Sequence, residues 1–205
     1  MAQLNQDYLI YAAHGACWTA FGVTQSLRGT GAAATAAPAP APAPAPAVTQ
    51  ATAPFSRALL AFHSLAFAVM YFGIGNAVIP NRVPVWFAGQ RAIGTAIVFA
   101  GAALMCWALV WFRSWRFRAQ LDAGHELATG GPFAVVRHPI YEGLNFLAIG
   151  TAIWIPTALT WVAVVLMVVG SDLRGRAEER VLEKTFGQQY RDYCSRTRRF
   201  IPGIY

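Results

Sequence analysis

The chain has 205 residues, of which 56% are hydrophobic and 12% are charged, and its formal net charge is +7. An average soluble domain carries about 25% charged residues, so this composition excludes an ordinary soluble enzyme and favours a bilayer as the place where apolar side chains are buried. The three cysteines, Cys17, Cys106 and Cys194, are odd in number and form no CxxC pair. Neither a disulfide framework nor a zinc site is therefore expected.

Five apolar stretches predict an all-α, polytopic membrane protein with about five transmembrane helices. They cover residues 8–27, 55–79, 90–112, 140–155 and 157–170. A helix needs about 20 residues to cross the hydrocarbon core, and the last two stretches are shorter and meet at Pro156. We therefore expect them to form a tight helical hairpin.

An alternating Ala-Pro run, Ala37–Ala47, separates the first two stretches. Alternate prolines forbid a helix and favour an extended, semi-rigid segment. We therefore divide the chain into a first helix over 1–30, a linker over 31–54 and a membrane core over 55–205.

The basic residues indicate the orientation in the membrane. If five helices cross it, all of the 16 Lys and Arg residues except Arg82 and Arg91 fall on one side. Because basic loops stay in the cytoplasm, the C-terminus is expected there and the N-terminus outside. This placement favours a lipid bilayer rather than nucleic acid as partner, and we expect a bacterial inner membrane. It does not indicate an oligomeric state.

The segment from Asp172 to Tyr205 combines charged residues with apolar and aromatic ones at helical spacing. The spaced residues are Val181, Leu182, Phe186, Tyr190 and Tyr193. The pattern predicts a C-terminal amphipathic helix on the cytosolic membrane face, ended by Pro202.

Two blocks carry the residues with chemistry. In residues 124–143 a glycine-rich loop enters a helix through Arg137-His138-Pro139. Proline suits the first helical turn, and the unpaired N–H groups of that turn form a site for an anionic group. In residues 174–183 acidic and basic side chains lie four apart, a spacing that is also usual for solvated surface charges.

Several short motifs occur in one order over residues 124–202. They are His125-x-Leu127-x-Thr129-x-Gly131-Pro132-Phe133, Arg137-His138-Pro139-x-Tyr141-x-Gly143, Arg174-x-x-x-Glu178-Glu179-x-x-Leu182, Phe186-Gly187-x-x-Tyr190-x-x-Tyr193 and Arg199-Phe200-Ile201-Pro202. In this order the region resembles the isoprenylcysteine carboxyl methyltransferase family and its bacterial relatives, including phospholipid N-methyltransferases. The first 120 residues match only as generic membrane helices.

The resemblance implies a cytosolic pocket for S-adenosyl-L-methionine between the Arg-His-Pro helix and the C-terminal segment. The residues expected to bind this cofactor are His125, Leu127, Gly131, Arg137, His138, Pro139, Tyr141, Glu178, Glu179 and Tyr190. Arg137 or His138 suits the cofactor carboxylate, and Glu178 or Glu179 suits its ammonium group. Aromatic rings suit the adenine or the sulfonium.

The expected catalytic residues are Arg174, Glu142 and Tyr141. The resemblance implies that Arg174 holds an acidic head group of the substrate. Glu142 and Asn145 are polar residues three apart at the start of a membrane helix, where polar groups usually mark a site. Glu142 either binds or deprotonates a basic substrate, or lies hydrated at the interface. The acceptor, a small or lipophilic carboxylate, amine or thiol, stays open.

Two other functions are compatible with the sequence. One is a membrane NADPH-dependent reductase of the sterol-reductase type, and the other is a non-catalytic protein that retains the fold. No GxGxxG motif occurs, so a soluble dinucleotide-type fold is not indicated. No metal site is expected, because His125 and His138 lack a third ligand. His14 and His63 lie in apolar runs and are expected to be packed and hydrogen-bonded.

Overall fold

The computed structural model describes residues 6–31, 51–52, 56–111, 120–121 and 127–205. Nearly all of the predicted linker, and His125, lie outside these residues. Five long helices are present: α1 (Leu9–Gly31), α2 (Ser56–Val78), α3 (Gln90–Trp111), α4 (Pro139–Trp154) and α5 (Ala158–Phe186). The short helix α6 (Gln188–Arg196) follows α5, and the 3-10 turns η1 (Gln6–Tyr8) and η2 (Gly131–Ala134) precede α1 and α4. Two-residue strands, β1 (Ala51–Thr52) and β2 (Gln120–Leu121), pair antiparallel. The predicted all-α fold is confirmed.

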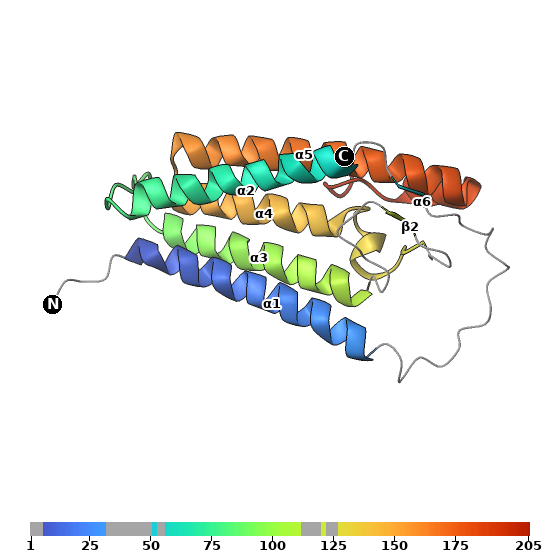
Figure 1. Ribbon diagram of the computed structural model, residues 1–205, viewed down its shortest axis with the longest axis horizontal. Coiled ribbons are helices and arrows are strands. Elements are labelled where there is room, and N and C mark those ends of the chain that lie inside the picture. The colour runs from blue at the N-terminus through green and yellow to red at the C-terminus, as the bar shows by residue number, and fades with distance from the viewer. Residues whose placement is uncertain (1–5, 32–50, 53–55, 112–119, 122–126) are drawn as a thin grey trace.

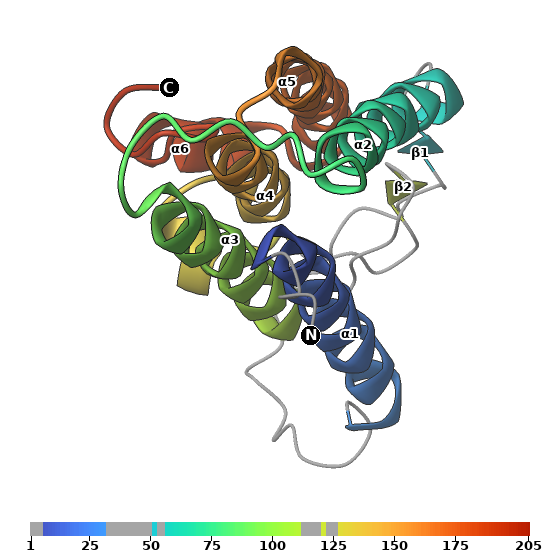
Figure 2. The ribbon, with the colours of Figure 1, turned by 90° about the vertical axis from the view of Figure 1, so that its left-hand side faces the viewer.

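The five long helices lie side by side in one bundle, and successive helices run in opposite directions (Figure 1). Seen along the bundle, α4 lies between α3 and α5, while α1 packs on α3 and α2 packs on α5 (Figure 2). Eleven of the 16 residues of α4 are buried. The helix that carries the Arg-His-Pro motif is therefore the centre of the bundle.

Glycines allow α3 and α4 to approach closely at two levels. A Cβ added to Gly94 would lie 2.6 Å from the carbonyl oxygen of Gly150, and one added to Gly101 would lie 2.5 Å from that of Gly143. Side chains at these positions would force the two backbones apart. Small residues at helix contacts are typical of membrane bundles, where close backbone packing replaces the hydrophobic effect.

By length and composition, three helices of the described chain qualify as membrane spans: Arg57–Val78, Gln90–Trp111 and Ala158–Phe186. The predicted number of about five is therefore not reached on this measure. The helix α4 has only 16 residues and is largely enclosed by its neighbours, so it presents little apolar surface to lipid. The helix α1 ends in a polar stretch that contains Thr24, Gln25 and Ser26.

The predicted hairpin at Pro156 is confirmed, since α4 ends at Trp154 and α5 begins at Ala158. Thr157 caps α5 by accepting a hydrogen bond from the backbone N–H of Thr160. The 29 residues of α5 extend about 43 Å, which exceeds the roughly 30 Å of the hydrocarbon core. This helix is therefore longer than a perpendicular crossing of the bilayer requires.

The predicted C-terminal amphipathic helix is present but divided. Gly187 adopts a positive φ of 53° and separates α5 from α6. The helix α6 ends at Arg196, so the prediction that Pro202 ends it was wrong. The chain leaves α6 early because Thr197 is extended and Arg198 pairs with Val136.

Buried polar contacts attach α1 to the bundle. At its start, Asp7 accepts hydrogen bonds from Arg91 at 2.6 and 3.0 Å and from the indole of Trp154 at 3.2 Å. Further along, His14 bonds Tyr71 of α2 at 3.1 Å and Thr151 of α4 at 2.9 Å. The hydrogen-bonded packing expected for His14 is thus confirmed.

Candidate active site

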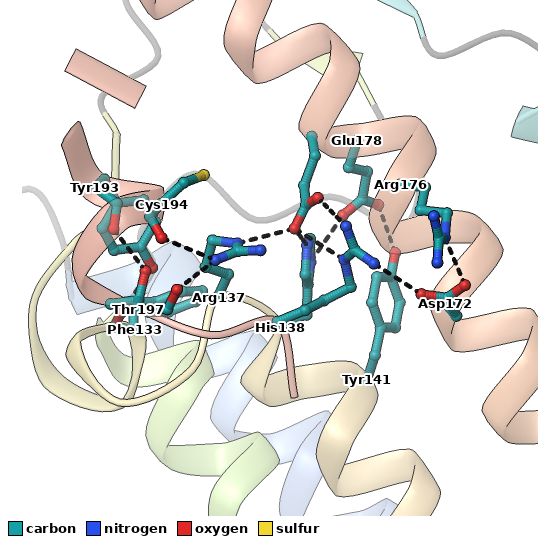
Figure 3. Close-up of polar contacts among 12 residues, drawn as sticks. Phe133, Arg137, His138, Tyr141, Asp172, Arg176, Glu178, Tyr193, Cys194 and Thr197 are labelled. Atoms are coloured by element: carbon teal, nitrogen blue, oxygen red, sulfur yellow. Dashed lines mark hydrogen bonds and ion pairs between the residues drawn. The ribbon is translucent and has the colours of Figure 1, made fainter. Parts of the chain in front are cut away.

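The polar residues of the two motif blocks meet where α4 begins and α5 runs past it. The C-terminal segment lies along the loop that enters α4. The backbone N–H of Arg137 donates to the carbonyl oxygen of Arg198 at 2.8 Å, and that of His138 donates to the carbonyl oxygen of Arg199 at 3.2 Å. The C-terminal segment therefore already occupies some of the backbone N–H groups at the start of α4 that we expected to bind an anionic group. Figure 3 shows the side chains of Arg137, His138 and Tyr141 directed towards α5.

Glu179 is the centre of an ion cluster. Its carboxylate accepts from Nε of Arg137 at 2.9 Å, from Nε2 of His138 at 3.2 Å and from Arg199 at 3.1 and 2.5 Å. Its side chain is 13% exposed. Three cationic or polar donors thus saturate Glu179 and tie the entry of α4, the end of α5 and the C-terminal segment together.

Arg137 also holds the end of α6. Its Nη1 donates to the carbonyl oxygens of Thr197 at 2.5 Å and Cys194 at 3.4 Å (Figure 3). These bonds and the contact with Glu179 direct the guanidinium into protein. The expected role of Arg137, binding the cofactor carboxylate, stays a prediction, and in this arrangement its observed partners are structural.

A second ionic group lies on the outer side of the cluster and was missed in the sequence. Asp172 accepts from Arg176 at 2.6 Å, from Arg199 at 3.0 Å and from the hydroxyl of Tyr205 at 2.7 Å. The available signals were the four-residue spacing of Asp172 and Arg176 and the position of Arg199 in the closing motif. Neither signal identifies the partner in the other segment.

Tyr141 lies between two imidazoles. Its ring stacks with that of His63 at a centroid distance of 5.7 Å and an interplanar angle of 27°, and with that of His138 at 5.7 Å and 24°. Its hydroxyl donates to Glu178. The guanidinium of Arg174 stands 5.1 Å from the ring centroid and 4.0 Å from Glu178. The structure thus brings together Tyr141, Arg174 and Glu178, three of the predicted site residues.

The two adjacent glutamates differ in their surroundings. The side chain of Glu178 is 24% exposed, against 13% for Glu179. Glu178 bonds the tyrosine hydroxyl and lies 3.7 Å from Nδ1 of His138 and 4.0 Å from Arg174, whereas Glu179 is enclosed by donors. Of the pair that the sequence left open, Glu178 is therefore the less enclosed carboxylate.

The pKa values of two groups beside the cluster are shifted by their surroundings. The hydrogen bond to Glu179 raises the pKa of the Arg199 guanidinium above its ordinary value, so this arginine stays charged. Burial raises the pKa of Tyr190, and the charge of Glu179 raises it further. The Tyr190 side chain is 3% exposed, and its hydroxyl has no hydrogen-bond partner among the residues described.

Glu142 lies in the first turn of α4, next to Tyr141, and its printed bond is to a residue outside the ion cluster. One carboxylate oxygen accepts from Nδ2 of Asn145 at 3.1 Å, and Asn145 in turn accepts from Ser171 at 2.9 Å. Glu142 is half-buried and forms no ion pair with any residue in the described ranges. Within the part of the chain that the structure describes, it is a carboxylate without a fixed countercharge at the start of a bundle helix.

The remaining predicted residues lie outside the polar cluster. Pro139 is the first residue of α4, as the motif predicts. Gly131 has a φ of 57°, and a Cβ there would fall 2.5 Å from the indole of Trp111, so this glycine fits the loop against the end of α3. Leu127 is half-buried in the same loop. Gly131 has no side chain that could join the cluster, and His125 lies outside the described residues.

A helical bundle with apolar spans and a saturated ion cluster at one end defines an integral membrane protein with a constructed polar site. Comparison with known proteins gives the class of that site. A family model described as phospholipid methyltransferase matches residues 90–189.

Plant methyltransferases are similar over much of the chain. The probable protein-S-isoprenylcysteine O-methyltransferases of Oryza sativa subsp. indica and subsp. japonica are each 27% identical over 145 residues, which cover 69% of this chain and 75% of theirs. Protein-S-isoprenylcysteine O-methyltransferase B of Arabidopsis thaliana is 30% identical over 117 residues, covering 57% of this chain and 55% of its own. These matches confirm the predicted resemblance to the isoprenylcysteine carboxyl methyltransferase family and support a membrane methyltransferase.

Proposed function

We propose that the protein transfers a methyl group from S-adenosyl-L-methionine to a lipophilic acceptor whose nucleophile carries a proton, an amine or a thiol. The observation that carries this proposal is a set of two carboxylates: Glu178, which lies against Tyr141 and Arg174, and Glu142, which has no countercharge among the described residues. The first offers a cofactor seat and the second a proton acceptor. The family matches support methyl transfer as the reaction.

The residues present fit the cofactor. Glu178 is the more exposed of the two glutamates and suits an ammonium group, and the stacked rings of Tyr141 and His138 form a wall beside it. The unpartnered hydroxyl of Tyr190 offers a further polar contact. At Gly175, an added Cβ would lie 3.3 Å from the His138 ring, so the glycine keeps α5 close to this wall. When bound, the cofactor supplies an electrophilic methyl group on sulfur.

Glu142 decides between the acceptor classes. A carboxylate acceptor needs no base, and the negative charge of Glu142 would oppose it. An ammonium or thiol acceptor is favoured, because Glu142 accepts the proton that leaves the nucleophile. The lone pair that remains on nitrogen or sulfur would then form the new bond to the methyl carbon as the bond from that carbon to the cofactor sulfur breaks, with S-adenosylhomocysteine as the leaving group. In this reaction Arg174 and Tyr141 orient the reacting groups and exclude water.

The membrane orientation follows from charge. The site end of the bundle carries Arg137, Arg174, Arg176 and Arg199, whereas Arg82 and Arg91 lie towards the other end. On the positive-inside rule the site faces the cytoplasm, and we assign the protein to a bacterial inner membrane. A lipophilic acceptor would then reach the site from the cytoplasmic leaflet.

The test is methyl transfer from tritiated S-adenosyl-L-methionine by purified protein in nanodiscs. The acceptors are decylamine, decanethiol and N-acetyl-S-farnesylcysteine, and NADPH-dependent reduction is followed in parallel. We expect label on the amine or the thiol and a strong loss of rate in Glu142→Gln. Label on the farnesylcysteine carboxylate alone, or NADPH oxidation without methyl transfer, would contradict the proposal.

A further inference from the structure

Three buried side chains connect α2, α5 and α4 to Glu142. Nε2 of His63 lies 3.4 Å from Oγ of Ser171, which lies 2.9 Å from Oδ1 of Asn145. Nδ2 of Asn145 lies 3.1 Å from Oε2 of Glu142. Exposed fractions are 3% for His63, 0% for Ser171 and 5% for Asn145. The chain of contacts is thus shielded from water over three of its four residues.

The chemistry of each group fixes the direction of these bonds. An ionised Glu142 only accepts, so Asn145 must present its NH₂ group to it and its carbonyl oxygen to Ser171. Ser171 therefore donates its single hydroxyl proton to the carbonyl oxygen of Asn145. The oxygen of Ser171 can then only accept from His63, which requires a proton on Nε2.

The same logic accounts for the other nitrogen of His63. Its Nδ1 has no hydrogen bond of good geometry among the described residues, although the backbone of Leu59, four residues earlier on α2, also acts on the imidazole. A proton on Nδ1 would thus gain at most a poorly aligned partner, whereas a bare lone pair costs less in an apolar bundle. The structure thus favours a neutral His63 with its proton on Nε2.

Packing holds the imidazole in this position. A Cβ added to Gly170 of α5 would lie 3.2 Å from Nδ1 of His63 and 3.0 Å from Phe62. The ring of Tyr141 stacks on the imidazole, with the two ring centroids 5.7 Å apart. The glycine lets the ring reach Ser171, and the stack joins the same histidine to the cofactor wall.

We propose that His63, Ser171 and Asn145 are positioning residues, which hold Glu142 as the proton acceptor for the methyl acceptor through this directed chain of hydrogen bonds. The inference rests on the proposed function and assigns His63 more than the packing role that its apolar setting indicates. The chain ties up Oε2 of Glu142, and no described residue donates to Oε1.

The direction of the chain is tested without any acceptor. Nitrogen-15 NMR of histidine-labelled protein in nanodiscs reports the tautomer, and His63→Gln assigns the signal. We expect a neutral ring protonated on Nε2 in the parent protein and a mixture of tautomers in Glu142→Leu, in which Asn145 is free to turn. A ring protonated on Nδ1 in the parent protein would overturn the proposal.

The role in catalysis is tested with the acceptor that the methylation assay identifies. His63→Leu is expected to lower kcat by about tenfold with an unchanged KM for the cofactor, and His63→Gln to restore it, since its amide can donate to Ser171. His14→Leu, which removes another buried imidazole, is the control and should leave kcat unchanged. Equal kcat values in His63→Leu and the parent protein would refute a positioning role.

The NMR and kinetic experiments distinguish a failure of this inference from a failure of the proposed function. Absence of S-adenosylhomocysteine binding by the parent protein would remove the proposed function, while the NMR result would still decide whether the chain exists. Binding and turnover that do not respond to His63 or Asn145 variants would remove only this inference.

Discussion

Arg199 donates two hydrogen bonds to Glu179, from Nε at 3.1 Å and from Nη2 at 2.5 Å, although the two residues are 20 positions apart in the sequence. The same guanidinium reaches Asp172 through Nη1 at 3.0 Å. A single arginine of the C-terminal segment therefore connects two turns of α5. This bidentate pair keeps the segment folded over the entry of α4 and so completes the wall of the candidate site.

Replacing Glu179 should unfold this wall. Glu179→Ala leaves Arg137 and Arg199 without their shared anion in a largely enclosed position, and removal of one partner from such a group costs about 3 kcal/mol. We expect the free energy of unfolding in detergent to fall by about that amount. Glu183→Ala, an exposed carboxylate of the same helix, should have little effect. Equal stability of the two variants would show that the cluster does not hold the segment.

The hydroxyl of Tyr205 should stabilise the same segment locally. It bonds Asp172, Arg176 and Arg199, each at 2.7 Å. We expect Tyr205→Phe to speed amide hydrogen exchange in residues 198–205 several-fold, because a net hydrogen bond contributes about 1 kcal/mol. Tyr8→Phe, at an equally exposed tyrosine near the other end of the bundle, is the control. Unchanged exchange in Tyr205→Phe would refute the contribution.

The glycine contact between α3 and α4 should tolerate no large side chain. Gly101→Leu places atoms where the backbone of Gly143 lies, and overpacking of this kind costs about 1–3 kcal/mol. We expect a lower midpoint of thermal unfolding and reduced binding of S-adenosylhomocysteine, because α4 carries the site. Gly22→Leu on α1, where no atom lies within 4 Å of an added Cβ, should leave both unchanged. A Gly101→Leu protein as stable as the parent would contradict the close contact.

The helices were predictable because hydrophobicity alone marks them. The start of α3 at Gln90 and the hairpin at Pro156 follow directly from where apolar runs meet polar residues or proline. The break at Gly187 was not predicted, because a helical spacing of aromatic residues continues across it. Only the pairing of Arg198 with Val136 explains why the chain leaves the helix before Pro202.

The site was predictable in its members but not in its pairings. The motifs brought out Arg137 and Glu179, yet 42 residues separate them, and nothing local indicates that they bind each other. The sequence left Glu178 and Glu179 equivalent, and burial in the folded protein distinguishes them. His63 and Ser171 lie in apolar runs, so their connection to Glu142 depends on the packing of three helices.

The most direct test is isothermal titration of S-adenosylhomocysteine into purified protein in detergent, repeated with Glu178→Gln and Glu183→Gln. We expect saturable binding by the parent protein and by Glu183→Gln. Binding by Glu178→Gln should be weaker by about tenfold or more, because a charged hydrogen bond to the ammonium is lost. No binding by a folded parent protein, or equal affinity in both variants, would contradict the proposed cofactor seat.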